Sequence, residues 1–362
     1  MTVPRDTVAR DGASSTLGGS STRGGTRADR RTRALRGTRV AVVIAVLIVL
    51  VAALSLSLGA VAVAPGDILA ALVGRADRLT RFVILDLRAP RIVAAVLVGG
   101  CLGLSGALFQ TLARNPLASP DIIGITASAS ATGAVALVWF GLTGLALSGA
   151  VVAGTLVAAV IIYLLSWRDG LSGYRFVLIG IGAAAVFGGI VSYVLTTADI
   201  TDVQQALVWI TGSLNNVDPV ALVVLAASAA ALMPCALLLA RPLAALGLGD
   251  DTAAAIGVRV ERTRLLVVAV AVALAAVAVS VAGPIAFVAF VAAPIARRLV
   301  GRGALALVSS ALIGALVLVV SDIVAQFAVP GVVFPVGVVT GIVGAPYLIW
   351  LLVGTNRVGQ GG

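Results

Sequence analysis

The residue types that carry most protein chemistry are scarce in this chain. It has no lysine and no histidine, and its two cysteines are Cys101 and Cys235. Without lysine there is no phosphate-binding loop of the GxxxxGK(S/T) type, and without histidine the commonest metal ligand and proton shuttle are missing. Both cysteines fall in apolar runs and are interpreted as packing residues. The sequence therefore predicts no catalytic residue, no metal site and no cofactor, and the chain is not expected to be an enzyme.

Long uncharged stretches dominate the rest of the sequence. Hydrophobic residues make up 60% of the chain and charged residues 11%, with a mean hydropathy of +1.14, whereas soluble domains are about 25% charged. The 46 residues of 122–167 include no charge. As one helix they would extend roughly 70 Å, over twice the ~30 Å bilayer core, so they must hold two helices joined near 141–144.

The same reasoning along the chain predicts an all-α polytopic membrane protein with about ten transmembrane helices. They are expected at residues 40–62, 91–113, 121–141, 144–167, 176–198, 219–240, 263–282, 285–300, 303–322 and 336–354.

The arginines test this topology. An even number of spans places both termini on one side of the membrane. If that side is the cytoplasm, the inner segments hold 20 of the 25 arginines and the outer segments hold five, as the positive-inside rule requires. The net charge of +10 is then explained by arginines facing anionic lipid headgroups, and no nucleic-acid partner is expected.

The chain divides into one membrane domain and two tails. Residues 1–38 are rich in Arg, Ser, Thr and Gly without apolar periodicity, which predicts a disordered, Arg-rich cytoplasmic tail. Residues 39–356 are the transmembrane domain, and residues 357–362 are a short cytoplasmic tail. The apolar run 40–64 is too long for the core of a cleaved signal peptide.

Acidic residues avoid the middle of every predicted span. Asp322, at the outer end of the ninth span, is the nearest exception. Carriers coupled to protons or sodium need ionisable or closely placed polar groups near the membrane centre. If the chain moves a solute uphill, the energy must therefore come from another polypeptide, which points to a partner ATPase. A secondary carrier or an exporter stays open as an alternative.

The largest predicted inner loop covers residues 241–264 and contains a short helix. Asp250 is placed as its N-cap, residues 251–255 follow, and Gly257 supplies a left-handed C-cap. A soluble partner could grip such a helix and transmit force to the spans on either side. A surface helix without a partner is the alternative interpretation.

Several ordered motifs resemble the FecCD family of permeases, which serve importers of iron–siderophore complexes, haem and vitamin B12. The segment RNPLASPDIIG at 114–124 is its most recognisable signature. The other matching blocks are at residues 87–110, 246–257, 283–288, 294–297, 321–325 and 335–346.

The resemblance implies a type II ABC-importer permease fold, with residues 39–356 as the permease domain in the bacterial inner membrane. It also implies a dimer with the translocation path at its interface, a cytoplasmic ABC ATPase dimer and an extracytoplasmic siderophore-binding protein. The residues carried over for ATPase coupling are Gly249, Asp250, Asp251, Thr252 and Gly257. Those carried over for docking the binding protein are Arg88 and Arg91. Some relatives have a further docking arginine where this chain has Gln326, so Arg75, Arg78 or Arg81 could substitute.

Two blocks narrow the expected substrate. Residues 293–299 (APIARRL) and 206–214 (ALVWITGSL) resemble ferric-enterobactin permeases most. Those permeases work as unlike pairs, which implies a paralogous permease subunit and a ferric siderophore of the catecholate type. A homodimeric permease for vitamin B12 or haem is the alternative within the family.

Overall fold

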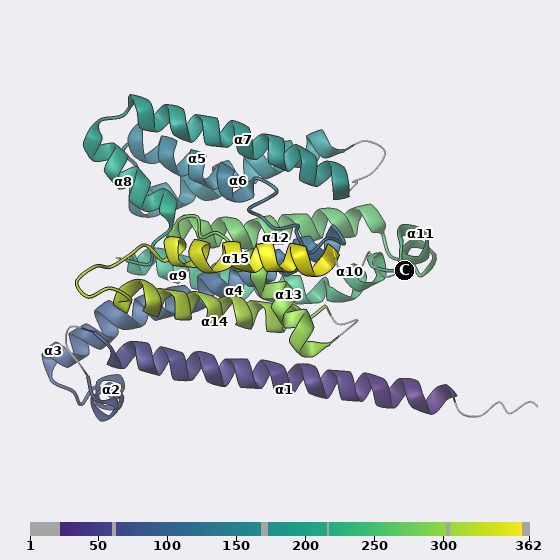
Figure 1. The fold of residues 1–362 in the computed structure, drawn as a ribbon, viewed down its shortest axis with the longest axis horizontal. Helices are drawn as coiled ribbons and strands as arrows, with labels where there is room; N and C mark the ends of the chain where they lie inside the picture. The colour runs from purple at the N-terminus through teal and green to yellow at the C-terminus, as the bar shows by residue number, and fades with distance from the viewer. Residues whose placement is uncertain (1–21, 60–62, 168–172, 216, 302–304, 357–362) are drawn as a thin grey trace, which may run out of the picture.

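The computed structural model describes residues 22–59, 63–167, 173–215, 217–301 and 305–356. Within these residues no strand forms beyond an isolated bridge between Val329 and Val332. Most helices lie side by side along the long axis of the molecule, with α5, α6 and α7 in a layer at one edge and α1 at the opposite edge (Figure 1). The long helices are α1 Thr22–Ser57, α4 Ala89–Leu112, α6 Gly144–Ser166, α7 Gly173–Thr197, α9 Pro219–Leu238, α12 Val260–Ala282, α14 Leu307–Phe327 and α15 Val336–Asn356.

Shorter helices lie at the ends of the bundle or break its interior. At one end are α2 Pro65–Leu72, α3 Arg78–Arg81, the π-helical η1 Phe82–Arg88 and α8 Ile200–Thr211. At the other end are α10 Ala240–Leu246 and α11 Asp250–Ala255. Following the predicted orientation, we call the first the outer end and the second the inner end. The remaining short helices are α5 Ile125–Val138 and α13 Val288–Val300.

Each of the ten predicted spans overlaps one of these helices. Among the described residues, seven helices are long and apolar enough to cross a membrane, in α1, α4 with its N-terminal extension, α6, α7, α9, α12 and α14. Helix α15 has 21 residues, whereas α5 and α13 are shorter, with 14 and 13 residues. The prediction of an all-α polytopic membrane protein is thus confirmed, with α5 and α13 too short to cross a membrane by themselves.

The two short interior helices begin late because the chain breaks before each of them. Gly124 has φ +83° and precedes α5, and a Cβ there would lie 2.8 Å from the carbonyl oxygen of Gly180. Before α13, Gly283 has φ +70° and Pro284 lacks a backbone N–H, so α12 cannot continue. The predicted spans 121–141 and 285–300 therefore lose their first residues to irregular backbone.

Helix α1 begins inside the segment predicted to be a disordered tail. Its N-terminus is at Thr22, so residues 22–38 are helical, while residues 1–21 and 357–362 lie outside the described part of the chain. Arginine and alanine favour a helix, and extending the existing membrane helix needs no new nucleation. The sequence pattern missed this because the extension has no apolar stripe.

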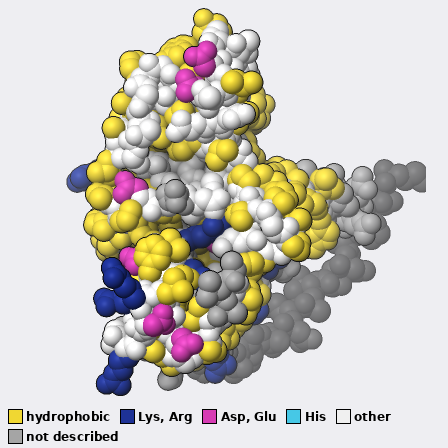
Figure 2. All heavy atoms as spheres, turned by 90° about the vertical axis from the view of Figure 1, so that its left-hand side faces the viewer, with side chains coloured by type: hydrophobic (Ala, Val, Ile, Leu, Met, Phe, Trp, Pro, Cys, Tyr) yellow, Lys and Arg dark blue, Asp and Glu magenta, His cyan; other side chains and the backbone are white. Residues whose placement is uncertain are grey.

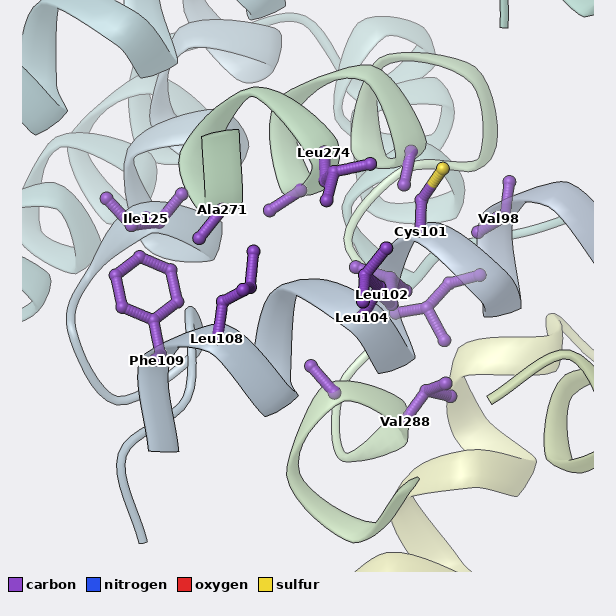
Figure 3. Close-up of a cluster of buried hydrophobic side chains, with 14 of the residues drawn as sticks. Val98, Cys101, Leu102, Leu104, Leu108, Phe109, Ile125, Ala271, Leu274 and Val288 are labelled. Carbon is purple, nitrogen blue, oxygen red and sulfur yellow. The ribbon is translucent and has the colours of Figure 1, made fainter. Parts of the chain in front are cut away.

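The core is built around α4, which packs against α9, α12, α13 and α14. Leu102, Leu104, Leu108 and Phe109 of α4 are among the largest fully buried side chains, and Figure 3 shows them between α12 and α13. Cys101 is buried in this cluster, whereas Cys235 is exposed. Lipid tails are as apolar as these side chains, so close packing stabilises the bundle more than the hydrophobic effect does.

Small residues allow that close packing. A Cβ at Gly99 of α4 would lie 2.4 Å from the carbonyl oxygen of Gly314 in α14. A Cβ at Gly106 would lie 1.8 Å from the carbonyl oxygen of Ala289 in α13. The helix backbones are therefore in contact at these positions. Helices α4, α13 and α14 form the closely packed centre of the bundle, between its outer and inner ends.

Candidate coupling and docking sites

The inner end carries the short helix predicted from the sequence. Helix α11 follows Gly249, which has φ +112°, and is followed by Gly257, which has φ +86°. Gly249 is the N-cap and Asp250 is the first helical residue, so the predicted N-cap was wrong by one position. The predicted left-handed residue at Gly257 is confirmed.

One buried side chain and two ion pairs to arginines hold α11 against the rest of the protein. Ala253 is its only buried residue, and it packs against Ala245 and Leu246 of α10. Asp250 forms ion pairs with Arg264 of α12 at 2.6 Å and with Arg114 at 3.6 Å. These contacts attach α11 to the first turns of α12 and to the loop after α4. A displacement of α11 would therefore be transmitted to both helices.

Arg114 belongs to the most recognisable sequence motif, and the structure shows what it contacts. It has φ +51° and its guanidinium donates a hydrogen bond to the carbonyl oxygen of Leu246 at the end of α10. Arg264 also pairs with Glu261 at 2.8 Å. Neither arginine was predicted as a site residue, although both lie at inner ends of predicted spans, next to the loop that carries Asp250 and Asp251.

The opposite face of α11 is open. Asp251 and Thr252 are exposed, and the large apolar side chains of Leu248 and Ile256 are 69% and 62% exposed. Exposed apolar side chains beside a carboxylate, on a loop beyond the ends of the spans, are typical of a surface that another protein covers. This arrangement can bind a partner.

The outer end carries a hydrogen-bonded group of four polar side chains, which we call the outer polar network: Arg91, Asn215, Asp322 and Gln326. Arg91 donates from Nε and Nη2 to the Asp322 carboxylate at 3.0 and 2.7 Å, and from Nη1 to the side-chain oxygen of Asn215. Gln326 donates to the same carboxylate at 2.8 Å. The side chains of Arg91 and Asp322 are 16% and 2% exposed.

The sequence placed Asp322 at the outer end of a span, but in the structure it lies within a helix. Helix α14 continues to Phe327, so the carboxylate is inside the helix by more than one turn. A buried carboxylate at that depth is tolerated because it is paired and hydrogen-bonded. Of the two predicted docking residues, Arg91 is thus already neutralised by an internal counter-ion.

The second predicted docking residue, Arg88, ends η1 and is half-buried. Its Nη1 donates to the carbonyl oxygen of Leu56 near the end of α1, at 2.5 Å. Three further arginines at this end are exposed and form no ion pair within the described residues: Arg75, Arg78 and Arg81. Figure 2 shows basic and acidic side chains gathered over the lower half of this face, where α2 and α3 lie. The outer end therefore presents exposed positive charge beside the two predicted positions.

A cavity of about 750 Å³ opens next to the outer polar network. It lies among α8 and the outer ends of α5, α6, α9 and α12. Its polar lining includes Thr143, Ser148, Thr201, Gln204, Gln205, Ser213, Asn215, Asp218 and Ser280. Asn215 belongs to both the cavity wall and the network, so the two features are joined.

These features define the class of the protein. A tightly packed bundle of membrane helices, with a seated loop helix at one end and a charged face at the other, has the fold of an ABC-importer permease subunit. It superposes with a TM-score of 0.76 on an inward-facing metal-chelate-type ABC transporter, at 26% identity, covering 87% of this chain and 99% of that one.

The chain belongs to the FecCD transport family, whose signature matches residues 46–354. It is 41% identical over 309 residues to the ferric enterobactin transport system permease protein FepG of Escherichia coli, covering 83% of this chain and 91% of that protein. It is 37% identical to the FepD permease protein of the same system, covering 86% and 94%. The family resemblance of the sequence motifs is thereby confirmed, and the protein is a multi-pass membrane permease.

Proposed function

We propose that the chain is the transmembrane permease subunit of an ATP-driven importer of ferric siderophores, with catecholate chelates favoured. The observation that carries this proposal is the 41% identity to FepG over 91% of its length. The similarity to a metal-chelate-type transporter supports the same class of cargo. The metal would pass inside its chelate, since the described residues include no group of three or more His, Cys, Asp or Glu side chains that could hold a metal ion.

The energy would come from a cytoplasmic ABC ATPase dimer. Without lysine, the chain cannot form a phosphate-binding loop of the usual kind. The docking element would be α11 with its flanking glycines: Gly249, Asp250, Asp251, Thr252 and Gly257. The seat on Ala253 and the Asp250–Arg264 ion pair support this role, because they connect an exposed surface directly to α12.

The chain would form half of the translocation pathway, and a paralogous permease subunit would form the other half. Similarity to both FepG and FepD, two different permease proteins of one ferric enterobactin system, favours an unlike pair over a homodimer. In the inner membrane, both termini would face the cytoplasm, and α11 would then lie on the ATPase side.

The outer end would dock an extracytoplasmic siderophore-binding protein in the region of Arg88 and Arg91. The guanidinium of Arg91 has five N–H groups, and its three contacts leave one N–H on each terminal nitrogen for an external carboxylate. The exposed Arg75, Arg78 and Arg81 would add long-range attraction that weakens with salt.

The division of labour between the subunits gives a direct test. We expect the purified chain alone to hydrolyse no ATP, and the complex with its ATPase to do so, with further stimulation by the binding protein loaded with ferric enterobactin. The measurement is phosphate release from stringently pure preparations, and an ATPase carrying a disabled phosphate-binding loop is the control. Hydrolysis by the chain alone would contradict its role as a permease subunit.

A further inference from the structure

The Arg91 guanidinium joins three separate parts of the outer end. It extends from the first turn of α4, pairs with Asp322 of α14, and donates to Asn215 in the loop between α8 and α9. A planar guanidinium can make such contacts on two edges at once, whereas an ammonium cannot hold the same geometry. Arg91 is therefore placed to hold the loop against the rigid pair of α4 and α14.

The counter-ion fixes the direction of that guanidinium. Asp322 is 2% exposed and accepts from both Nε and Nη2, and Gln326 donates to its second side from the next turn of α14. With the Nε–Nη2 edge of the arginine thus occupied, Nη1 is left facing Asn215. The ion pair is neutral as a unit, which is the form in which charges are tolerated in a membrane bundle.

The same loop is also held by backbone hydrogen bonds at its first residues. The amide of Ser213 donates to the carbonyl oxygen of Ala282 at 2.8 Å, and the amide of Gly337 donates to the carbonyl oxygen of Gly212 at 3.1 Å. These bonds hold the backbone where α8 ends. Asn215 lies two residues after Ser213 and is exposed. Its backbone N–H donates only to the hydroxyl of Ser213, at 3.1 Å.

The loop forms part of the cavity wall. Ser213 and Asn215 line the cavity of about 750 Å³ together with Gln204 and Gln205 of α8. We propose that Arg91 is a positioning residue that holds the segment 212–215, and with it this wall, in place, with Asp322 as its fixed counter-ion. This role goes beyond docking and does not depend on which chelate or binding protein the transporter serves.

The test uses Asn215, because changing it leaves the Arg91–Asp322 ion pair intact. Asn215→Ala removes the oxygen that accepts from Arg91, whereas Asn215→Asp keeps one. Hydrogen exchange is measured by mass spectrometry on the full-length chain in the assembled transporter in nanodiscs, corrected for intrinsic rates. We expect Asn215→Ala to raise exchange of segment 212–215 at least tenfold and Asn215→Asp to leave it near the wild-type rate. Segment 65–71 of α2, at the same end of the bundle, is expected to be unchanged.

A second variant removes the Arg91–Asn215 contact by changing the arginine. Arg91→Lys keeps a positive charge beside Asp322 but cannot also hold Asn215, so it should raise exchange of segment 212–215 as Asn215→Ala does. Equal exchange in the alanine and aspartate variants would overturn the proposal, as would a rise that extends to α2. Wild-type exchange in all three variants would overturn it as well.

Discussion

Replacing Asp251 by lysine is expected to abolish ATP-driven uptake while leaving the chain folded and inserted. Asp251 is in the first turn of α11 and is exposed, and the residues that flank this helix in the chain include the exposed Leu248 and Ile256. A charge reversal at the centre of a protein interface typically costs several kcal/mol through like-charge contact. We expect uptake by reconstituted transporter to fall at least tenfold, together with loss of co-purifying ATPase.

The control for Asp251→Lys is Asp67→Lys, which reverses a matching exposed aspartate in the first turn of α2 at the outer end. It should leave both ATPase binding and uptake unchanged. Asp250→Lys should behave differently from Asp251→Lys, because it also breaks the ion pairs to Arg264 and Arg114. We expect it to loosen the loop itself, seen as faster proteolysis there. Normal uptake by Asp251→Lys would place the ATPase contact elsewhere.

Arg91→Glu is expected to prevent accumulation of folded protein. It would place a second carboxylate against Asp322, which is 2% exposed. Breaking a buried ion pair by removing one partner costs about 3–5 kcal/mol, and reversing the charge adds repulsion. Exchanging the two charges, as Arg91→Glu with Asp322→Arg, should restore folded protein, measured by fluorescence-detected size-exclusion chromatography. Failure of Arg91→Glu to reduce folded protein would contradict the buried pair.

The charge exchange also separates folding from docking. If Arg91 meets a carboxylate of the binding protein, the folded exchange variant should bind that protein at least tenfold more weakly, about 1.4 kcal/mol. Arg88→Glu alone should weaken binding in the same assay, because it reverses the charge at the second predicted docking position. Unchanged affinity in both variants would leave Arg75, Arg78 and Arg81 as the docking charges.

Much of this architecture could be predicted from the sequence because membranes impose strong rules. Uncharged runs located ten helices, and the distribution of arginine predicted their orientation. The inner-loop helix was predicted from Asp250 as its N-cap and Gly257 as its left-handed C-cap. The structure confirms the positive φ of Gly257 and moves the N-cap to Gly249. Each of these elements is determined by the local sequence of a single segment.

The parts that were missed depend on which helices are neighbours. Residues 91 and 322 are far apart in the chain, and their pairing appears only once α14 packs against α4. The predicted ninth span ended at Asp322, five residues before α14 actually ends. A signal was present, since both charges belong to the same predicted outer side. Helix α8, at residues 200–211, lies between two predicted spans, where no helix was predicted.

Inward transport of a ferric chelate by this chain, driven by a partner's ATP hydrolysis, is the function we propose. It is tested most directly by proteoliposomes containing the permease pair and its ATPase, with ATP inside and the binding protein outside. We expect iron-labelled ferric enterobactin to accumulate inside, with ferric dicitrate imported at least tenfold more slowly. Asp251→Lys should reduce accumulation to the level seen without ATP. Accumulation that persists without ATP and follows a proton gradient would contradict the account, because it would show that the chain is a secondary carrier.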